Sequence, residues 1–487
     1  MVFAKQMKLK IYRRGRLYRQ GHPQTTVRLP EKGLRVPPCI PLITQSSIAE
    51  KMGTNGNNKG LVLVAVLWVV VVLMVLVAVL GRKSLLDTKV CLARMEGVRC
   101  KWACRAGIEK AVGVLNEDTR ESDCLTDLWS DNEEDFNDIL LQRCWFTVRV
   151  VDEASKLNIN TATKGQLLEL PEMLEEIADS IIDWRDEDDT PSEGGAEGGY
   201  YENLPFGYMA RNGPFRTIRE LLLVKDVTPE LLYGEDTNFN DQLDYNEQDG
   251  DESPPNDDGD SELDKGWIAY LTCYSYDNNK DAEGNQKINI NNANENQLTS
   301  SLNISSSQAK WIADKIITNG NDYQSIGDLI SNNSPKSPPG GSEGNSDEAE
   351  PLDLQTFSQI ADKITVDDSQ KVPGKVNVNT ASEIVLAALL GGGDTAEQIA
   401  QEIIAYRETL LYGIQSIGEL LDIPSMNINT FKNIAGLITT RSDVFTIRCV
   451  ATADRNMVSG ATLETEAVVD RSSSPCKVLY WYQGASN

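Results

Sequence analysis

An uninterrupted apolar run, Leu61–Leu80, constrains the fold of this chain more than any other feature of its sequence. Its twenty residues include no charged residue, no glycine and no proline. At about 1.5 Å per residue, a helix of this length spans about 30 Å, the thickness of the hydrocarbon core of a bilayer. The preceding residues 1–60 carry twelve basic and two acidic side chains, a bias that places them in the cytoplasm. We therefore predict one transmembrane helix over residues 61–81, with the bulk of the chain exported.

The charge of the chain and its residue counts exclude several functions. The net charge is −27, and because residues 1–60 contribute +10, the remaining residues carry −37. Nucleic-acid binding depends on cations that displace counterions from phosphate. The strong negative charge of the exported part therefore argues against nucleic-acid binding. The single histidine, His22, precedes the membrane run, which excludes histidine-dependent triads and HExxH zinc sites. We predict that the chain is not an enzyme; a signal-anchored enzyme is an alternative for which no nucleophile–base pair stands out.

The junction before the apolar run resembles a type IV prepilin leader. Lys59-Gly60 directly precedes the run, and no small-residue signal-peptidase site follows it. In such leaders the prepilin peptidase cuts after the glycine, which would make Leu61 the first mature residue and Ala65 the fifth. A signal anchor that is never cut is the alternative. Residues 1–60 are long for such a leader, and a translation start at Met52 would shorten it to nine residues.

A stripe of small and apolar residues extends beyond the membrane run. No proline follows the run before Pro171, so the helix can continue outward. The stripe has the 4-3-4-3 spacing of one helix face, and its small side chains suit close packing against a sheet or another helix. Its members are Leu86, Val90, Ala93, Gly97, Cys100, Cys104, Gly107, Ala111 and Val114.

Alternating apolar and polar residues predict strands on both sides of a long helical segment. One strand lies at 145–151, and others lie at 444–451, 461–469 and 477–482. We predict an α+β fold in which the transmembrane and stem helix packs on a small antiparallel sheet, interrupted by a large inserted all-α domain. The predicted parts are 1–60 (a basic cytoplasmic leader), 61–81 (the transmembrane helix), 82–156 (the stem helix and first strand), 157–441 (the insertion) and 442–487 (the closing strands).

Eight of the nine cysteines follow the membrane run. An exported domain can oxidise them, and their even number permits full pairing. Spacing does not determine the connectivity, but the local pairs Cys124–Cys144 and Cys449–Cys476 are possible disulfides. Because no CxxC pair occurs, a structural zinc site is not expected.

A motif of apolar residues alternating with asparagines occurs three times in the insertion, at Leu157–Ala162, Ile288–Ala293 and Val376–Ala381. Each copy precedes two apolar helices and a closing Ile-x-acid-Leu segment, and the Asn or Thr before each helix is an N-cap signal. The units resemble helix-hairpin-helix repeats, whose best-known use is to bind the DNA backbone through Gly-x-Gly turns. Here the turns lack either that glycine pattern or a nearby cation. We therefore interpret the units as a scaffold without nucleic acid.

An acidic segment matches a twelve-residue calcium loop. Its hard oxygen ligands and the lack of a nearby soft ligand favour calcium. A solvated acidic turn is the alternative, and position 6 holds Asp241 in place of the usual glycine. The predicted ligands, at positions 1, 3, 5, 7, 9 and 12, are Asp236, Asn238, Asn240, Gln242 (through its backbone carbonyl), Asp244 and Glu247.

These features together resemble the minor pseudopilin K family of type II secretion: a glycine-cut apolar helix, Ala65 where most relatives carry glutamate, and a sheet interrupted by a helical insertion. The phrases Ile181–Asp186, Tyr200-Tyr201, Asn212–Phe215 and Tyr233–Asp236 add to the resemblance. It implies a pilin-like domain at the tip of a periplasmic pseudopilus, where the subunit initiates or caps assembly in protein export across the outer membrane.

The resemblance also implies partners and modifications. The partners are I- and J-type minor pseudopilins, other pseudopilus subunits and the prepilin peptidase. The location is the bacterial inner membrane, crossed once, with calcium in the insertion and N-methylation of Leu61 after cleavage. A membrane-anchored helix-hairpin-helix DNA receptor of competence type is the alternative, and it would need glycine turns and a basic face.

Overall fold

The computed structural model describes residues 59–236, 242–250, 253, 255, 257, 259–319, 322–330, 349–453 and 460–485. The predicted leader lies outside these ranges except for its last two residues. The chain divides into two compact units, Met1–Ala78 and Val79–Asn487. Helix α1 (Lys59–Glu117) contains the boundary between them.

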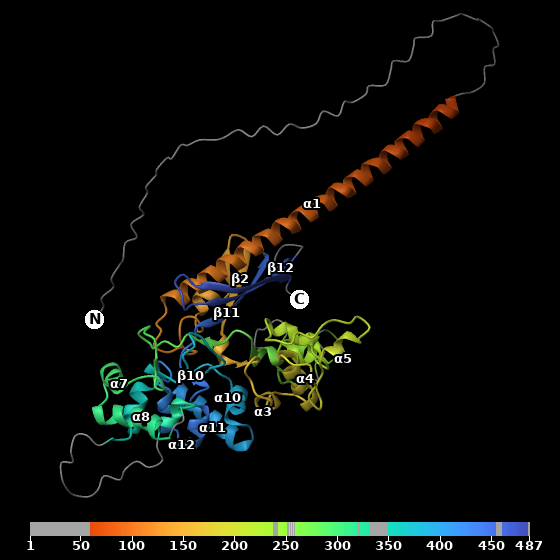
Figure 1. The fold of residues 1–487 in the computed structure, drawn as a ribbon. Helices are drawn as coiled ribbons and strands as arrows, with labels where there is room; N and C mark the ends of the chain where they lie inside the picture. The colour runs from red at the N-terminus through yellow and green to blue at the C-terminus, as the bar shows by residue number, and fades with distance from the viewer. Residues whose placement is uncertain are drawn as a thin grey trace, which may run out of the picture. The chain divides into compact units, whose positions relative to one another are not determined.

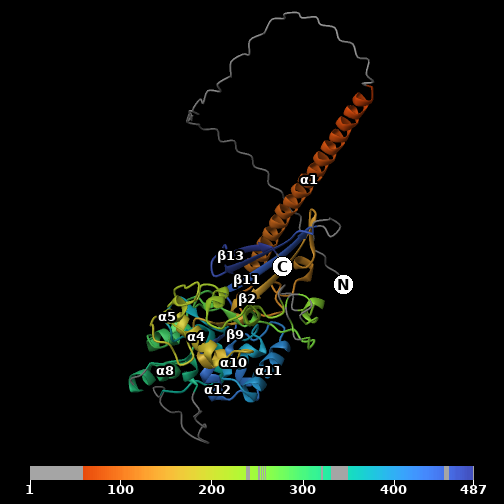
Figure 2. The same ribbon diagram turned by 90° about the vertical axis from the view of Figure 1, so that its right-hand side faces the viewer.

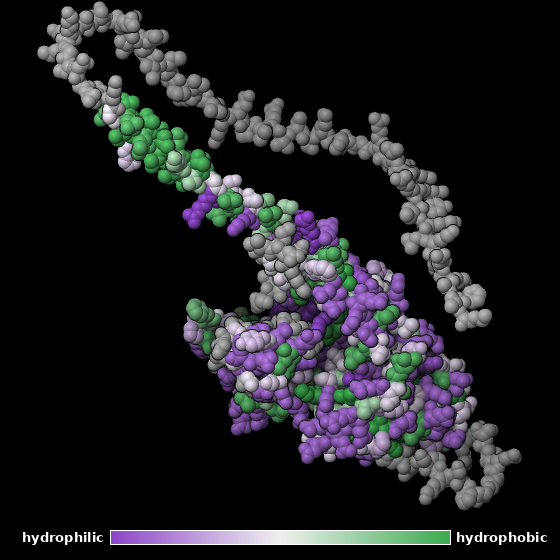
Figure 3. All heavy atoms as spheres, turned by 180° about the vertical axis from the view of Figure 1, so that it is seen from behind, coloured by the Kyte–Doolittle hydropathy of each residue, from purple (hydrophilic) through white to green (hydrophobic). Residues whose placement is uncertain are grey.

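The first part of α1 is the predicted membrane span. Among the described residues, α1 is the one helix long and apolar enough to cross a membrane. Its apolar side chains are exposed; Leu61, for example, is 76% exposed and Trp68 is 65% exposed. Figure 3 shows this segment as a continuous apolar surface. Such a helix suits lipid because all of its backbone hydrogen bonds are internal.

The second unit contains a five-stranded antiparallel sheet with the order β1-β2-β11-β12-β13 (Figures 1 and 2). Strand β2 pairs with β11 along its whole length, so strands on either side of the insertion lie side by side. The four predicted strands are confirmed, and β1, which follows the short helix α2 (Glu133–Phe136), was not predicted. The strands are β1 (Ile139–Leu141), β2 (Cys144–Asp152), β11 (Val444–Ala453), β12 (Thr462–Asp470) and β13 (Lys477–Ala485).

The C-terminal part of α1 packs on one face of this sheet through small side chains. Cys100, Cys104 and Ala111, all from the predicted stripe, are fully buried in this core. At Gly107 the helix and the sheet come closest, since a Cβ atom there would lie 2.7 Å from Cys449 Sγ and 2.8 Å from a methyl of Val148. Only glycine permits this approach without displacing the sheet side chains.

A second hydrophobic core lies wholly within residues 157–438, separate from the core under α1. This separation confirms the predicted α+β architecture, in which a helical domain interrupts the strands of the sheet. The insertion is not purely helical, however. Each repeat begins and ends with a two-residue strand, and these two strands pair in parallel.

The three repeat units have the same order of elements, which the structure places as follows. The first unit contains β3 (Leu157–Asn158), α3 (Lys164–Leu168), α4 (Glu175–Arg185), η2 (Ile218–Leu223), α6 (Pro229–Tyr233) and β4 (Leu271–Thr272). The second contains β6 (Ile288–Asn289), α7 (Glu295–Leu302), α8 (Ser306–Asn319), η5 (Ile326–Leu329), α9 (Leu354–Ile360) and β7 (Ile364–Thr365). The third contains β9 (Val376–Asn377), α10 (Glu383–Leu390), α11 (Asp394–Glu408), η7 (Ile417–Asp422), α12 (Ile428–Ile434) and β10 (Ile438–Thr439). The connecting elements are η1 (Glu153–Ser155), α5 (Gly198–Glu202), η3 (Tyr245–Glu247), η4 (Trp267–Ala269), η6 (Ala361–Lys363) and the paired strands β5 (Tyr276–Asp277) and β8 (Val372–Pro373).

The second asparagine of each motif explains why the motif recurs. Its side chain accepts from the backbone N–H and donates to the backbone C=O of one residue that precedes the closing 3-10 helix. This pair of bonds, at 2.7–3.1 Å, satisfies backbone groups that no strand partner serves. The pairs are Asn160 with Phe215, Asn291 with Tyr323, and Asn379 with Ile414. The helix N-caps are Thr163, Asn294 and Ser382, so the predicted Asn or Thr caps the helix in the first two units, and a serine caps it in the third.

Candidate functional site

The predicted processing site lies at the start of α1. Gly60 and Leu61 are in its first turn, and both are exposed. Apart from its chain neighbours and the backbone of its own helix, no described heavy atom lies within 4 Å of the position that a Cβ atom would take at Gly60. Ala65 is exposed one turn further along the helix. The described structure therefore leaves the predicted cleavage site and the fifth mature position open to contact with another molecule.

Beyond the predicted span, α1 keeps an exposed apolar surface before it reaches the sheet. The first members of the predicted stripe, Leu86, Val90 and Ala93, are exposed, whereas burial on the sheet begins with Glu96 and Cys100. Val98 and Trp102 are also exposed, at 55% and 63%. Apolar side chains in this position are suited to packing against another apolar helix.

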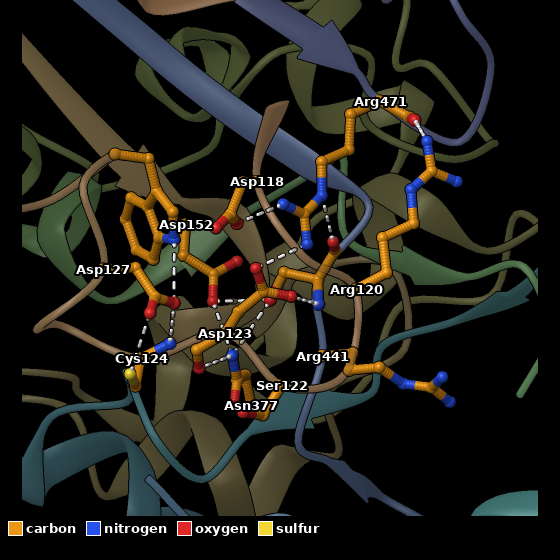
Figure 4. Close-up of polar contacts among 12 residues, drawn as sticks. Asp118, Arg120, Ser122, Asp123, Cys124, Asp127, Asp152, Asn377, Arg441 and Arg471 are labelled. Carbon is orange, nitrogen blue, oxygen red and sulfur yellow. Dashed lines mark hydrogen bonds and ion pairs between the residues drawn. The ribbon is translucent and has the colours of Figure 1, made fainter. Parts of the chain in front are cut away.

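A buried polar cluster fastens the insertion to the sheet (Figure 4). Arg471 follows β12 and is 2% exposed. Its Nη1 donates to Asp118 Oδ2 at 2.8 Å, its Nη2 donates to Asp123, and its Nε donates to the Ser442 carbonyl at 3.1 Å. Burial raises the pKa of Asp123 to about 7, although the guanidinium opposes this shift. The pair is tolerated in the interior because each charge has a partner.

Asn377 of the third repeat extends this cluster. Its Nδ2 donates to the Asp123 carbonyl at 3.1 Å and to Asp152 Oδ2 at 3.0 Å, and Asp152 also accepts from Ser442 Oγ at 2.6 Å. Because Asp152 ends β2 and Ser442 precedes β11, these bonds fix where the chain leaves the sheet and where it returns. We call this cluster the joint; it consists of Asp118, Asp123, Asp152, Asn377, Ser442 and Arg471.

The predicted calcium loop is closed at its base by two glycines. Gly234 has a φ of +63°, and a Cβ atom there would lie 2.3 Å from the backbone nitrogen of Gly266. The Glu235 N–H donates to the Asp264 carbonyl at 2.9 Å, and the Asp264 N–H donates to Glu235 Oε2 at 3.3 Å. The chain therefore enters and leaves this acidic segment at one point.

Two predicted ligands at the ends of the loop are buried carboxylates. Asp236 is 5% exposed and Glu247 is 1% exposed. Glu247 Oε2 accepts the Asp244 N–H at 2.9 Å, which starts the short helix η3. Carboxylates withdrawn from water fit a hard cation. Gln242 is exposed and Asp244 is half-buried, whereas Asn238 and Asn240 lie outside the described residues, so the ligand set stays a prediction.

The hairpin turns of the first and third units have acidic side chains beside them. In the third unit, Gly391, Gly392 and Gly393 all have positive φ. A Cβ atom at Gly392 would lie 2.0 Å from the carboxylate of Glu169, so this turn packs against an acidic side chain of the first unit. In the first unit, Glu175 and Glu176 start α4. Carboxylates at these positions repel phosphate.

All eight described cysteines are free thiols in the structure. Cys144 Sγ lies 3.7 Å from Cys100 Sγ, and Cys124 Sγ donates to Asp127 Oδ1 at 3.3 Å. Cys476 Sγ donates to Asn116 Oδ1, also at 3.3 Å. The disulfides Cys124–Cys144 and Cys449–Cys476 stay predictions, which peptide mapping of the unreduced protein would test.

The joint was missed by the sequence analysis because its members come from five separate segments and have no common spacing. Its one sequence signal is Arg471, a basic residue between two predicted strands of an acidic domain. A second buried acidic group, formed by Asp183, Asp186 and Glu197, was also missed. Asp183 and Asp186 fell within a phrase noted for family resemblance, and Glu197 lay outside every motif that the sequence offered.

Two segments of the chain match family models. Residues 150–233 match the family described as Type II secretion system (T2SS), protein K. They run from the end of β2 through α6, and the match confirms the resemblance seen in the sequence. Residues 373–439, the third repeat, match the helix-hairpin-helix motif. None of the curated proteins matches the chain.

One solved structure with which the chain shares similarity is described as the crystal structure of the GspK-GspI-GspJ complex from the enterotoxigenic Escherichia coli type 2 secretion system. The sequence identity is 14% and the TM-score is 0.43. The alignment covers 81% of this chain and 99% of that chain.

Proposed function

We propose that this chain, which resembles the type II secretion system protein K family over residues 150–233, is a minor pseudopilin at the tip of the pseudopilus. There it would initiate or cap pseudopilus assembly in protein export across the outer membrane, as a structural component and not an enzyme. The observation that carries this proposal is that the matched segment begins in β2, a strand of the sheet on which the apolar helix α1 packs. An apolar helix that continues into a folded domain can enter a helical fibre.

The proposal requires removal of the leader after Gly60 and N-methylation of Leu61 by the prepilin peptidase. It places the rest of the chain in the inner membrane and the periplasm. N-terminal analysis of the mature protein purified from membranes tests it. A methylated Leu61 at the N-terminus is expected. Recovery of peptides from residues 1–59 in the mature protein would reject it in favour of an uncut anchor.

The tip position rests on Ala65. In a pilus, the glutamate at mature position 5 neutralises the N-terminal amine of a neighbouring subunit inside an apolar bundle, where an unpaired charge is costly. Ala65 has no carboxylate to neutralise the N-terminal amine of a subunit above it. The lack of this carboxylate is without cost only where no subunit lies above. The large insertion beside the sheet also suits the end of a fibre better than its body.

We propose I- and J-type minor pseudopilins as direct partners. The protein K of the solved complex is assembled with GspI and GspJ. In this chain, the exposed part of the stripe on α1 is an apolar helix face that could pack against such partners. Val90→Asp places a charge on this stripe, so recovery of I- and J-type partners on co-purification should fall at least tenfold. Thr88→Asp adds the same charge to an exposed residue off the stripe and should leave recovery unchanged. Equal recovery with both variants would reject this interface.

We also propose that the loop from Asp236 to Glu247 binds calcium. Its support is the closed base at Gly234 and Gly266 and the burial of both terminal carboxylates. Calorimetry of the chelated full chain in detergent should show calcium binding, and Glu247→Gln should weaken it at least tenfold. Glu262→Gln, at an exposed acid outside the twelve positions, is the control. Wild-type protein that binds no calcium below millimolar concentration would end the proposal.

The competence-type DNA receptor gains no support from the helix-hairpin-helix match. That match describes the fold of the third repeat, while its glycine turn faces Glu169. We propose that the chain binds no nucleic acid, and salt-dependent retention on immobilised DNA would contradict this.

A further inference from the structure

Four buried cysteines lie where α1 packs on the sheet. Cys100 and Cys104 belong to adjacent turns of α1, Cys144 is the first residue of β2, and Cys449 belongs to β11. All four are at most 1% exposed. Cys100 Sγ lies 3.7 Å from Cys144 Sγ, so a thiol of the helix is in direct contact with a thiol of the sheet. Cys104 Sγ donates instead to the backbone carbonyls of Cys449 and Leu463, both at 3.3 Å.

A disulfide between Cys100 and Cys144 needs little rearrangement. The two residues belong to the same hydrophobic core. A sulfur–sulfur bond is about 2.05 Å long, so the two sulfur atoms would have to approach by about 1.7 Å. The competing hydrogen bond is the one that Cys100 Sγ donates to the Ala461 carbonyl at 3.4 Å. A thiol is a weak donor, so the loss of this bond does not oppose the approach.

Cys124, the partner that sequence spacing suggested for Cys144, lies near the other end of β2. Its neighbour Asp123 belongs to the joint, together with Asp152, the last residue of β2. The nine residues of that strand, at about 3.3 Å each, separate its two ends by about 26 Å. The Cα atoms of a disulfide lie within about 7 Å of each other. Cys144 can form one disulfide only, and its contact favours Cys100.

The contact between the two thiols lies where α1 first meets the sheet. Leu92 and Met95 of α1 are still 48% and 46% exposed, whereas Cys100 is fully buried. Packed elements open most readily at the ends of their contact. A covalent bond at this end of the contact would therefore keep α1 on the sheet when the helix is pulled.

We propose that Cys100 and Cys144 form a disulfide that joins α1 covalently to β2. The thiolate of one cysteine attacks the disulfide of a periplasmic thiol oxidant, which forms a mixed disulfide and releases one oxidant thiol. The second cysteine then displaces the other oxidant sulfur. The pair thereby loses two electrons and two protons, and the oxidant disulfide is reduced to two thiols. An oxidising compartment is required, so the disulfide rests on the periplasmic location that is part of the proposed function.

The burial of both thiols determines when the bond forms. Burial, aided by the hydrogen bond with Cys144, raises the pKa of Cys100 to about 12, and burial also raises the pKa of Cys144. Only a thiolate attacks a disulfide, and an oxidant cannot reach either sulfur once α1 is packed. The bond therefore forms while the exported chain folds, and it resists reduction afterwards.

Mass spectrometry of the full-length protein, purified from membranes in detergent and alkylated without reductant, tests the disulfide. Trypsin cuts after Lys101, so it separates Cys100 from Cys104. A linked pair of peptides that contain Cys100 and Cys144 is expected, and reduction should release it. Alkylation of both cysteines after unfolding without reductant would overturn the proposal. A peptide that links Cys144 to Cys124 would overturn it as well.

Substitutions supply a second readout through hydrogen exchange. Cys100→Ala and Cys144→Ala should each speed exchange of the amides of residues 97–111 at least tenfold. The double variant should exchange like the single variants, because either substitution removes the bond. Cys91→Ala, at an exposed cysteine of the same helix, is the matched control and should exchange like the wild type. Unchanged exchange in Cys100→Ala, or single effects that multiply in the double variant, would overturn the proposal. If a variant fails to fold, the linked peptide of the wild type decides.

N-terminal analysis of the same sample separates this proposal from the proposed function. A mature protein that begins at Leu61 but has free Cys100 and Cys144 thiols rejects the disulfide alone. A linked peptide in a chain that keeps its leader supports the disulfide and rejects the processing.

Discussion

At the scale of single residues, Arg471 is the member of the joint whose loss should destabilise the protein most, because it is the ion-pair partner of a fully buried carboxylate, Asp123. We predict that Arg471→Met destabilises the protein by about 3–5 kcal/mol, the usual cost of leaving one member of a buried ion pair behind. Chemical denaturation of the full chain in detergent measures this free energy of unfolding. Arg143→Met, at an exposed arginine of the β1–β2 turn, is the matched control and should change it by less than about 0.5 kcal/mol.

The same variant has a predicted pH dependence. Burial already raises the pKa of Asp123 to about 7, and removal of Arg471 would raise it further. A protonated Asp123 needs no counter-ion, and the native state then binds a proton that the unfolded chain lacks. The stability deficit of Arg471→Met should therefore shrink as the pH falls from about 8 to about 5. A deficit that is equal at both pH values would show that lost packing, and not the unpaired charge, causes it.

A second residue-scale prediction concerns Lys375. Its ammonium lies 3.3 Å from Asp277 Oδ2, which Lys287 also contacts at 2.9 Å. Burial, aided by repulsion from Lys287, lowers the pKa of Lys375 to about 8. Between about pH 8 and 10 the unfolded chain binds the proton that the native state has lost, so this residue makes stability rise with pH, by at most about 3 kcal/mol.

The variant Lys375→Met should lack this part of the rise. Denaturation curves at about pH 8 and about pH 10 measure it as the difference between wild type and variant. Lys363→Met, at a lysine whose side chain is 41% exposed, is the control and should follow the wild type. If wild type and Lys375→Met had the same pH dependence of stability, a lowered pKa of Lys375 could not be the cause of the rise.

At the scale of elements, the second and third repeats pack on each other reciprocally. Gly327 of η5 lies against α12, since a Cβ atom there would come within 2.9 Å of Lys432 Cα. Gly418 of η7 lies against α9, since a Cβ atom there would come within 2.8 Å of Ser358 Cα. The first repeat has Arg219 at the equivalent position, and its guanidinium lies 4.3 Å from the ring centre of Tyr482 on the sheet. At this position of the repeat, glycine therefore occurs where two repeats pack on each other, and arginine occurs where the repeat contacts the sheet.

We predict that Gly327→Ala and Gly418→Ala each destabilise the protein by about 1–3 kcal/mol, because the added methyl would lie within 3.0 Å of a backbone Cα atom at both positions and also meets the Ser358 side chain at Gly418. Denaturation measures the change. Gly113→Ala is the control, since no atom lies within 4 Å of its Cβ position on α1 and alanine favours a helix. If Gly327→Ala were as stable as this control, η5 and α12 would not pack as closely as described.

Sequence patterns predicted those elements whose signals are local. The apolar run, the period-two strands and the repeat motif each depend on neighbouring residues, and each has its counterpart in the structure. The Asn or Thr before the helix is the N-cap in the first two units, whereas the second asparagine of each motif serves a long-range bond that the sequence did not reveal, such as the one Asn160 accepts from the Phe215 N–H. Strand β1 was missed because it is three residues long and ends in a turn where Gln142 has a φ of +59°. The two-residue parallel strands have no periodicity to detect.

At the scale of the whole molecule, the candidate sites also divide into those whose residues are close in sequence and those whose residues are brought together only by the fold. The proposed calcium loop can be recognised in the sequence because its expected ligands follow a fixed spacing within twelve residues. The joint could not, since Asp118, Asn377 and Arg471 are brought together only by the return of the chain from the insertion to the sheet. The group around Glu197 shows the intermediate case. Its acids are close in sequence, but only burial distinguishes them from the exposed acids of the same loop.

The last prediction concerns the proposed place of the molecule at the tip of a fibre. If Ala65 alone kept the subunit at the tip, Ala65→Glu would let it enter the fibre body, because the new carboxylate could neutralise the amine of a neighbour. We expect that it does not, because the insertion packs through the joint and through Arg219 against the same sheet that carries α1. A head of this size would have to repeat at every subunit of the fibre.

Immunogold labelling of purified pseudopili is the measurement. The wild type and the Ala65→Glu variant are both expected to label fibre ends only. Its control is Ala78→Glu, an exposed position of the same helix away from the mature N-terminus, which should lower membrane insertion and labelling together. Label along the fibre length with Ala65→Glu would show that the missing carboxylate, and not the bulk of the insertion, determines the position.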